Sequence, residues 1–249
     1  MRKTRIHVDA ALTSGQTIRL PEEIARHLVA VLRLRPGDPC WLFRGDGVDY
    51  RAELLEADKR GVVAMIHEAS ATPPASPLSI TLIQGIARGE KMDLILQKAT
   101  ELGVDVLAPV FSQRSEVRLT GERLDKRMQH WQGVVRGACE QSGRGTMPRL
   151  LPACDLAQRM AETQGDDGLR VRLEPKAESG LTDIASNPPP SRITLLVGPE
   201  GGLSDQDHAC AAAAGFGTLR LGPRVLRTET AGLAAIAAMQ VLWGDLGHN

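Results

Sequence analysis

Short runs of apolar or alternating residues fill the first seventy positions and predict β-strands. Turn sequences separate these runs, notably PGD at 36–38 and GDG at 45–47. Pro21–Leu34 is expected to be a helix, because a proline followed by two glutamates suits a first helical turn. The expected strands are Arg5–Val8, Thr17–Leu20, Cys40–Phe43, Tyr50–Leu55 and Val62–His67. Short strands with one helix predict a small β-barrel, and such barrels often bind RNA.

The clearest break in the pattern is Ala69–Pro77, with three prolines among small and polar residues. Such a segment suits neither a helix nor a central strand, so it is interpreted as a linker. We expect a barrel domain over residues 1–70, a linker over 71–77 and a second domain over 78–249.

After the linker, apolar strands alternate with amphipathic helices. The expected strands are Leu78–Gln84, Val104–Phe111, Leu169–Leu173, Arg192–Val197 and Thr218–Leu221. The expected helices are Lys91–Leu102, Gly121–Ser142, Ser204–Ala214 and Thr230–Trp243, and the expected surface loops are Gln164–Gly168 and Asn187–Pro190. This alternation predicts an α/β fold, with a mostly parallel sheet and helices on both faces.

The composition narrows the class of protein only slightly. Of 249 residues, 42% are hydrophobic and 24% are charged, which is typical of a globular chain and excludes a mainly disordered one. Thirty basic residues balance thirty acidic ones, so the net charge does not indicate a nucleic-acid or membrane partner. A neutral total still permits a local basic face. Aromatic residues make up 3%, too few for an extensive base-stacking platform.

The cysteines and histidines show no metal-ligand spacing. Cys40, Cys139, Cys154 and Cys210 are far apart, and no CxxC or HExxH sequence occurs. Reduced thiols and no metal are expected. The chain begins without a secretory signal and has no apolar run long enough to span a membrane, so a cytoplasmic protein is expected.

A glycine-rich motif, Gly198–Gly202 (GPEGG), follows one expected strand directly and precedes a helix with Ser204 as its N-cap. Glycines at the carboxyl end of a parallel strand let the backbone approach a ligand closely. A tight strand-to-helix turn without a ligand would have the same sequence, so the motif alone leaves both interpretations open.

The segment Leu221–Thr230 (LGPRVLRTET) is more informative. It also leaves a strand, and it places Arg224 and Arg227 at the start of a helix that Thr228 or Thr230 can cap. Arginines are mildly unfavourable at the positive end of a helix dipole, which favours an anionic partner there. The small residues of the following helix indicate close packing, either in the core or against a second subunit.

Gln84–Lys91 (QGIARGEK) resembles a phosphate loop only superficially, because the glycines are too close together and Met92 stands where Ser or Thr is needed. Lys91 and Lys98 share one helix face, which either meets RNA phosphates or is a solvated charged face. No GxGxxG fingerprint and no GxSxG motif occur, which argues against a Rossmann dehydrogenase, an ordinary Rossmann methyltransferase and an α/β-hydrolase.

Four long motifs, in order along nearly the whole chain, resemble the signatures of a known family. They are RGEKMDLILQKATELGVD (Arg88–Asp105), ACEQSGR (Ala138–Arg144), LLVGPEGGLS (Leu195–Ser204) and LGPRVLRTETA (Leu221–Ala231). VLRLRPGD (Val31–Asp38) is similar to the N-terminal pattern of the same family. The resemblance is to the RsmE family, the 16S ribosomal RNA uridine-N3 methyltransferases of the SPOUT superfamily.

The resemblance implies an N-terminal PUA-like RNA-binding barrel and a C-terminal SPOUT domain with a deep trefoil knot. It also implies a homodimer that binds S-adenosylmethionine at the knot and acts on 16S rRNA in the 30S ribosomal subunit. The cofactor-binding residues that it implies are Leu173, Leu196, Gly198, Gly201, Gly202, Leu221, Gly222, Val225, Leu226 and Thr228. The segment after Leu173 does not align firmly with the first knot loop of the family.

The chemistry of the implied substrate suggests roles for charged residues. Uracil N3 carries a proton, which a carboxylate removes or whose loss cationic groups favour by stabilising the uracil anion. The catalytic candidates are Arg227 and Glu229, together with Arg88 to grip the nucleotide. The RNA-binding candidates are Arg33, Arg35, Lys91, Lys98 and Arg224. N3 lies on the pairing edge of the base, so the nucleotide must be unpaired or flipped.

Two alternatives stay open at this point. A SPOUT methyltransferase for another RNA position has the same motifs, and an RNA-binding factor without activity would keep the fold. Intact cofactor loops argue against the second alternative, and a nucleotide-dependent oxidoreductase is disfavoured by the missing fingerprint.

Overall fold

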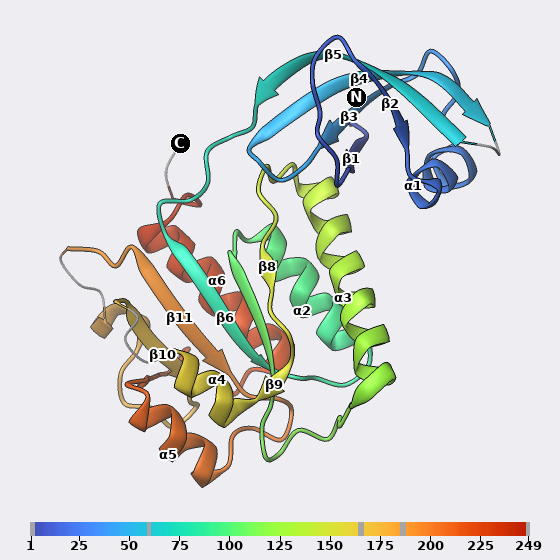
Figure 1. Cartoon of the computed structure of the whole chain (residues 1–249). Helices are drawn as coiled ribbons and strands as arrows, with labels where there is room; N and C mark the ends of the chain where they lie inside the picture. Colours follow the sequence, from blue (N-terminus) through green and yellow to red (C-terminus); the bar gives the residue numbers. More distant parts are fainter. Residues whose placement is uncertain (1–2, 59–60, 164–166, 185–187, 248–249) are drawn as a thin grey trace. The chain divides into compact units, whose positions relative to one another are not determined.

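The computed structural model describes residues 3–58, 61–163, 167–184 and 188–247, and the chain divides into two compact units (Figure 1). The first unit comprises Met1–Ala75 and Cys139–Met147, and the second comprises Ser76–Ala138 and Pro148–Asn249. The break after Ala75 falls within the predicted linker. The inclusion of residues 139–147 in the first unit differs from the division expected from the sequence.

Five strands form the sheet of the first unit in the part of the chain that the structure describes. They are β1 (Arg5–His7), β2 (Thr17–Leu20), β3 (Pro39–Phe43), β4 (Val48–Asp58) and β5 (Gly61–Ala71). The sheet order is β1-β3-β4-β5-β2, with β1 parallel to β3 and the other neighbours antiparallel. Inward-facing residues such as Leu42, Leu54 and Ile66 build its hydrophobic core. All five predicted strands are therefore confirmed.

Two predicted boundaries in this unit are wrong. Strand β5 continues to Ala71, because its last residues pair with Val48–Tyr50 of β4 and so take up the start of the predicted linker. The single helix predicted over Pro21–Leu34 is instead α1 (Glu22–Arg26) followed by a π-helical turn, η1 (His27–Val31). Arg33 then adopts a left-handed backbone conformation with φ of 57°, which ends the helical path.

Residues 139–147 join the first unit through the buried side chain of Arg5. Its guanidinium donates hydrogen bonds to the carboxylate of Asp49, the shortest of them 2.8 Å long, and to the backbone carbonyls of Cys139 and Arg144. The backbone N–H of His7 donates to the Glu140 carboxylate at 3.0 Å. These contacts hold the ACEQSGR motif to β1. They also give the buried Arg5 charge the partners that a buried charge needs.

The second unit contains a parallel sheet, which confirms the α/β class. Its strands are β6 (Ser79–Gly85), β7 (Val106–Phe111), β8 (Arg149–Leu150), β9 (Cys154–Asp155), β10 (Leu169–Leu173), β11 (Arg192–Val197) and β12 (Gly217–Leu219). The order is β12-β10-β11-β6-β7-β8, with β9 also paired to β7, and every pairing is parallel. The carboxyl ends of these strands therefore meet at one edge.

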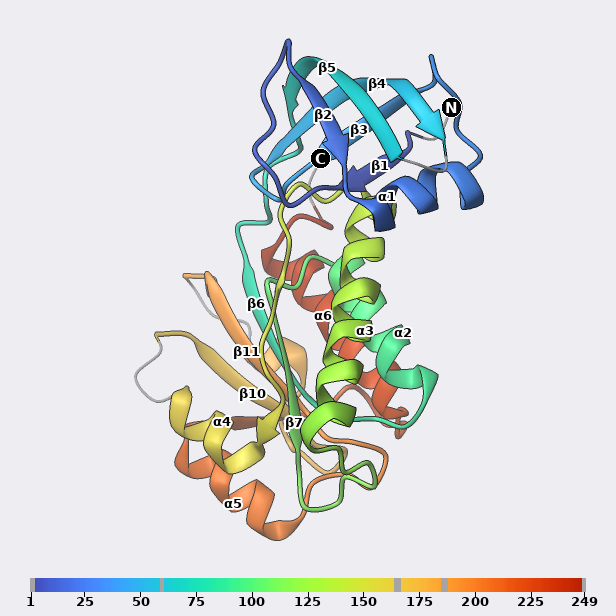
Figure 2. The same cartoon turned by 45° about the vertical axis from the view of Figure 1, so that its right-hand side comes forward.

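Helices cover both faces of this sheet, as the alternation predicts (Figures 1 and 2). They are α2 (Glu90–Glu101), α3 (Gly121–Ser142), α4 (Leu156–Glu162), α5 (Asp205–Ala213) and α6 (Thr228–Trp243), with a 3-10 turn η2 (Leu181–Ile184). Helices α2, α3 and α6 lie on one face, and α4 and α5 lie on the other. Met160 of α4 and Ala211 of α5 pack with Leu196 in the core on their side.

The hydrophobic pattern does not predict β8, β9, α4 or η2. Of the two predicted surface loops, residues 164–166 and 187 lie outside the described residues.

Candidate functional site

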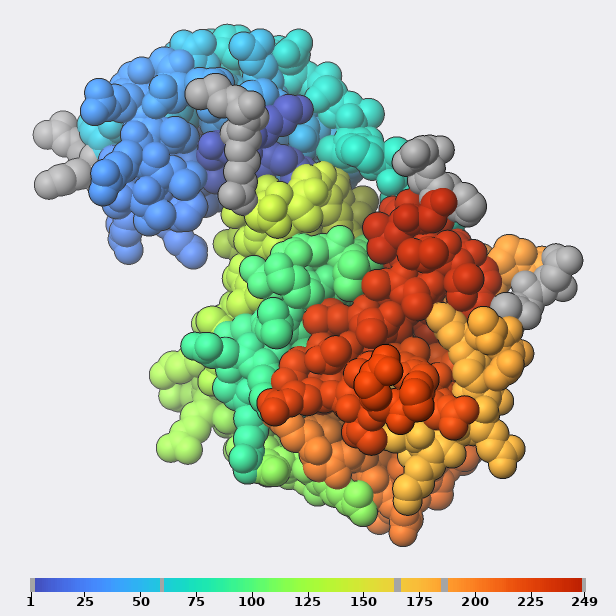
Figure 3. All heavy atoms as spheres, turned by 180° about the vertical axis from the view of Figure 1, so that it is seen from behind, coloured from blue at the N-terminus to red at the C-terminus, as the bar shows by residue number. Residues whose placement is uncertain are grey.

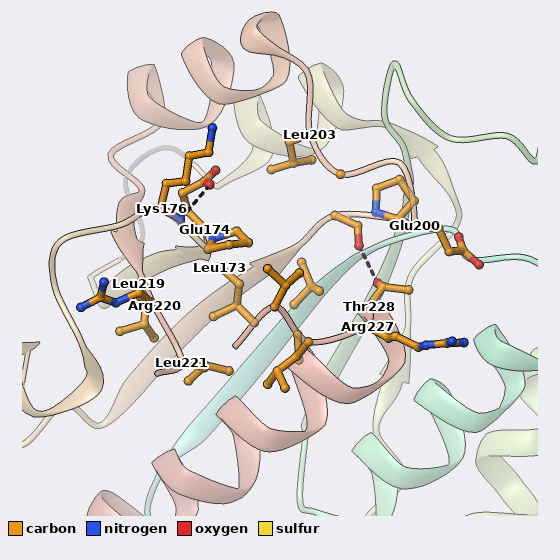
Figure 4. Close-up of a pocket in the computed structure, with 18 of the residues that line it drawn as sticks. Leu173, Glu174, Lys176, Glu200, Leu203, Leu219, Arg220, Leu221, Arg227 and Thr228 are labelled. Atoms are coloured by element: carbon orange, nitrogen blue, oxygen red, sulfur yellow. Dashed lines mark hydrogen bonds between the residues drawn. The ribbon is translucent and has the colours of Figure 1, made fainter. Parts of the chain in front are cut away.

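A cavity of about 940 Å³ lies at the carboxyl ends of β10, β11 and β12, which are neighbours in the sheet (Figure 4). This is the edge at which open parallel sheets bind ligands, and the volume suits a molecule of nucleotide size. The segments that line it follow these three strands, at 173–176, 197–203 and 219–231. Two of these segments contain motifs found in the sequence, GPEGG and LGPRVLRTET.

Tight packing and hydrogen bonds fix the loop after β11. Gly202, with φ of +69°, closes a turn by donating its N–H to the carbonyl of Pro199 at 2.8 Å. A Cβ atom at Gly85 would lie 2.5 Å from Pro199 Cδ, so only glycine lets β6 approach this loop so closely. Ser204 and Asp207 then form a capping box that begins α5.

A buried hydrogen-bond cluster ties this loop to the start of α6. The side-chain amide of Gln84, at the end of β6, donates to the hydroxyl of Thr228 at 3.1 Å and to the carbonyl of Gly85 at 2.9 Å. Thr228 donates in turn to the carbonyl of Gly198 at 2.6 Å (Figure 4). We name Gln84, Gly198 and Thr228 the floor cluster, because it joins the two glycine-rich segments beneath the cavity.

The loop before α6 is constructed differently. Val225 is 80% exposed, and no hydrogen bond among the described residues begins or ends at Leu221–Leu226. The expectation that Thr228 or Thr230 caps this helix is wrong. The N-cap is Arg227, without a side-chain cap, because the Thr228 hydroxyl is used in the floor cluster.

Three charged side chains meet at the side of the cavity. The ammonium of Lys91 lies 3.0 Å from a carboxylate oxygen of Glu200 and 4.0 Å from one of Glu229. Burial raises the pKa of Glu200, but hydrogen bonds from its own backbone, from Lys91 and from the Arg88 N–H outweigh it and lower the pKa below its usual value. Glu229 is 14% exposed, and its Oε2 is buried without a hydrogen bond.

The first segment contributes a pair that the sequence does not single out. Glu174 follows β10, and its carboxylate lies 3.2 Å from Nε2 of His208 on α5. The Glu174 side chain also accepts a hydrogen bond from the backbone N–H of Lys176, as Figure 4 shows. These residues are far apart in the sequence, so only the fold reveals the pair.

Most of the predicted site residues surround this cavity. Those that line it are Leu173, Gly198, Gly202, Leu221, Gly222, Val225, Leu226, Thr228, Arg227, Glu229, Lys91 and Arg224. Leu196 does not, because it is in the hydrophobic core. Nor does Gly201, which packs against the backbone of Arg114.

The remaining predicted residues lie elsewhere. The Arg88 side chain pairs with Glu116 outside the cavity lining, and Lys98 pairs with Glu101 along α2. Arg33 and Arg35 belong to the first unit.

The described residues contain no group of three His, Cys, Asp or Glu side chains placed to hold a metal ion. The four cysteines are free thiols, and burial raises the pKa of Cys40 to about 12 and that of Cys139 to about 11. No helix in the described ranges is long and apolar enough to cross a membrane.

The sequence matches two protein-family models. Residues 74–240 match the RNA methyltransferase domain, and residues 20–66 match the RNA methyltransferase PUA domain. The first match covers most of the chain and contains the whole cavity lining. The parallel fold and its edge cavity are thus those of an RNA methyltransferase.

Individual relatives narrow this class. Proteins named "Ribosomal RNA small subunit methyltransferase E" are 32% identical over 98% of this chain and 98% of their own in Buchnera aphidicola, and 30% identical over 94% and 95% in Bacillus subtilis. A Neisseria gonorrhoeae structure of that name, bound to S-adenosyl methionine, is 44% identical with a TM-score of 0.92, covering 98% of this chain and 99% of that one.

A Legionella pneumophila structure of a putative methyltransferase in complex with the bound cofactor is 36% identical with a TM-score of 0.93, covering 99% of this chain and 100% of that one. The chain belongs to the family of ribosomal RNA small subunit methyltransferase E.

Proposed function

We propose that the protein transfers a methyl group from S-adenosylmethionine to N3 of a specific uridine in 16S rRNA during maturation of the small ribosomal subunit. The observation that carries this proposal is that two family motifs, GPEGG and LGPRVLRTET, converge on one cavity at the carboxyl edge of the parallel sheet. The reaction is expected in the cytoplasm, where ribosomal subunits are assembled.

The cavity suits S-adenosylmethionine chemically. Its walls combine apolar side chains such as Leu173, Leu219 and Leu226 with exposed backbone of the glycine-rich loops. Apolar walls suit an adenine ring, and backbone N–H and C=O groups can pair with its polar edge. Gly202 and Gly222 both have positive φ and nothing within 4 Å of a Cβ position, so the backbone there is open to a ligand. When bound, the cofactor supplies an electrophilic methyl group.

The chain's own residues prepare the acceptor base. The Glu229 carboxylate has one buried oxygen without a hydrogen-bond partner, which is suited to take the proton from uracil N3. Arg227, two residues before Glu229 at the N-cap of α6, is placed to stabilise the negative charge that develops on the uracil oxygens. Lys91 adds a positive charge 4.0 Å from Glu229 and holds Glu200 at the same wall.

Positioning contributes much of the catalysis in this scheme. Holding two reactants in the right geometry removes on the order of 7–11 kcal/mol of barrier. The floor cluster fixes the start of α6, which carries Arg227 and Glu229, relative to the loop after β11. The target base must enter unpaired or flipped, because N3 lies on its pairing edge.

We further propose that the second unit is a SPOUT domain with a deep trefoil knot formed by the segments lining the cavity. Its sheet order supports this, since β10 lies between β11 and β12 although β12 follows β11 in the chain. Knots are rare exceptions among protein chains. The first unit is proposed to be a PUA-like barrel that binds RNA through residues including Arg33 and Arg35.

A homodimer is proposed from the surface of α6. Figure 3 shows this helix in red at the surface, next to α2 in green. Several large apolar side chains are exposed there, at Leu94, Val241, Leu242 and Leu246. Exposed apolar patches of this kind are typical of protein interfaces. Sedimentation of the purified protein at micromolar concentration tests this: a monomer contradicts it.

The test of the function is label transfer from S-adenosylmethionine to small ribosomal subunits that lack their native modification. Transfer to small but not large subunits is expected. Glu229→Gln and Arg227→Ala should each lower kcat by about a hundredfold while the Kd for the cofactor stays within twofold.

Arg192→Ala and Glu178→Gln are matched controls, because both side chains are exposed and neither lines the cavity. Undiminished transfer by the Arg227 or Glu229 variant would remove the assigned role. Cofactor binding without transfer to either subunit would reject the substrate, and no cofactor binding would favour a non-catalytic RNA-binding factor.

A further inference from the structure

A tight turn follows β7 at Ser112–Ser115, in a segment that the sequence motifs do not cover. The Ser115 N–H donates to the carbonyl of Ser112 at 3.1 Å, and the Ser112 N–H donates to the Ser115 hydroxyl at 3.0 Å. Both serines are buried, whereas the two central residues, Gln113 and Arg114, are exposed. The turn therefore places these two residues at the surface.

The capping box of α5 anchors this turn. The Gln113 N–H donates to the Asp207 carboxylate at 3.3 Å, and its side-chain oxygen accepts from the Ser204 hydroxyl at 2.8 Å. Arg118 donates to the carbonyl of Ser112 at 3.0 Å and braces the turn from its other side. These hydrogen bonds thus hold the backbone of the turn, including that of Arg114, before any ligand arrives.

Arg114 lies at the rim of the cavity. It lines the cavity, and its Nη1 donates to the carbonyl of Gly201 at 3.4 Å. A Cβ atom at Gly201 would lie 3.0 Å from the Arg114 carbonyl oxygen, so the turn packs directly on the GPEGG loop. Arg114 has no ion pair among the described residues, and its exposed guanidinium retains most of its donors.

The charges around the rim favour an anion. Six lysines and arginines but four carboxylates line the cavity. Three of these carboxylates already have partners, since Glu200 and Glu229 both pair with Lys91 and Glu174 lies beside His208. Within the described ranges, the lining cations without an ion pair are Arg114, Lys176, Arg220, Arg224 and Arg227.

We propose that the Ser112–Ser115 turn is a phosphate-binding subsite for the RNA backbone. Arg114 is the residue that binds the phosphate, next to the target nucleotide. A guanidinium pairs with two phosphate oxygens through parallel hydrogen bonds, and a turn whose backbone is already held loses little backbone entropy on binding. This rests on the proposed function for the identity of the polymer, but the binding itself does not depend on methyl transfer.

The experiment titrates wild type, Arg114→Ala, Arg114→Lys and Arg192→Ala with small ribosomal subunits and with naked 16S RNA at several salt concentrations. Arg114→Ala should weaken binding about tenfold. It should also reduce the slope of log K against log salt by about 0.7–0.9, the contribution of one phosphate. Arg114→Lys should recover the slope but only part of the affinity, because it lacks the guanidinium fork. Arg192→Ala removes the same charge from the opposite end of β11 and should leave both unchanged.

The Kd for S-adenosylmethionine and the unfolding midpoint are measured on the same samples. An unchanged salt slope and RNA affinity in Arg114→Ala would overturn the subsite. A raised cofactor Kd with unchanged RNA binding would overturn it in favour of a contact with the cofactor carboxylate. If wild type binds RNA with an Arg114-dependent slope yet transfers no methyl group, the proposed function fails while the subsite stands. If wild type methylates subunits and its RNA affinity and salt slope are the same in Arg114→Ala, the proposed function stands while the subsite fails.

Discussion

The loop at Gly198–Gly202 and the loop at Leu221–Arg227 line the same cavity, but they differ in the contacts that hold them. The first has an internal turn, a close approach to Gly85, and a carbonyl bonded to Thr228. The second contacts the floor cluster only where α6 begins, and Val225 is 80% exposed. Three of the five residues of the first loop are glycines, whereas the second has one glycine and two arginines.

This difference suggests a division of labour. A wall held by buried hydrogen bonds keeps its shape when empty, which lowers the entropy lost when a ligand binds. A wall without such bonds opens at little cost and closes over a ligand. We expect the loop after β11 to be the fixed wall and the loop before α6 to be the adaptable wall.

The largest expected effect is that of Gly85→Ala. The new Cβ would meet Pro199 backbone and ring atoms at 2.5–2.6 Å, and neither can move without disturbing the fixed wall. We expect a loss of about 3 kcal/mol in the free energy of unfolding, measured by denaturant titration. Gly222→Ala in the adaptable wall has open space and only a positive φ to strain it, so about 1 kcal/mol is expected. Equal losses in unfolding free energy for Gly85→Ala and Gly222→Ala would contradict the distinction between a fixed and an adaptable wall.

Gln84→Met tests the floor cluster. Gln84 is 1% exposed, and the substitution leaves the Thr228 hydroxyl and the carbonyl of Gly85 without their donor. We expect a loss of about 2 kcal/mol in the free energy of unfolding, with weaker cofactor binding. Gln158→Met on the exposed surface of α4 is the control. A Gln84 variant as stable as this control would show that the cluster holds nothing in place.

Glu200 gives the fixed wall a pH dependence. Because the folded state lowers the pKa of Glu200, its ion pair stabilises the protein above the unfolded pKa, near 4.5, and this stabilisation is lost as the pH falls through the folded value. We expect Glu200→Gln to lower the free energy of unfolding by about 1 kcal/mol or less at pH 7. This difference from wild type should disappear below pH 4. Unfolding at several pH values measures it, and a constant difference between variant and wild type would contradict it.

The smallest effect on stability is expected from Val225→Ser, about 0.5 kcal/mol or less, because the side chain is already exposed. Its effect should instead be on cofactor affinity, once the adaptable wall closes. Hydrogen exchange measures that closure: the amides of residues 221–226 should exchange quickly in the free protein and slow down with S-adenosylmethionine. Protection already complete in the free protein would contradict an adaptable wall.

The sequence predicts the regular parts of the fold well, because long periodic segments determine them. Helix α3 and strands β10 and β11 have the predicted bounds. Strands β8 and β9 are two residues each, and α4 is short, so their hydrophobic patterns are too brief to predict them. The two strands form by pairing with β7, and α4 is stabilised by packing against α5. The π-helical turn at His27–Val31 also continues a helical pattern, so the pattern does not show where the α-helix ends.

The sequence predicts the candidate site from the glycines of GPEGG and the arginines of LGPRVLRTET. The residues that the sequence did not single out act through partners distant in sequence. Gln84 bonds Thr228 across 144 residues, Gln113 bonds Ser204 across 91, and Glu174 meets His208 on another element. Conversely, Leu196 lies within a motif but is buried in the core, because helices cover both faces of the sheet and β11 is buried on both sides.

The central claim is that this cavity directs a methyl group to uracil N3, and the most direct test is to identify the product. Small subunits lacking their native modification are incubated with the protein and labelled S-adenosylmethionine, then digested to nucleosides for mass spectrometry. We expect the label in 3-methyluridine at one position of 16S rRNA, and its loss in Glu229→Gln. Label in any other nucleoside, or none in small subunits while the protein binds the cofactor, would contradict the account.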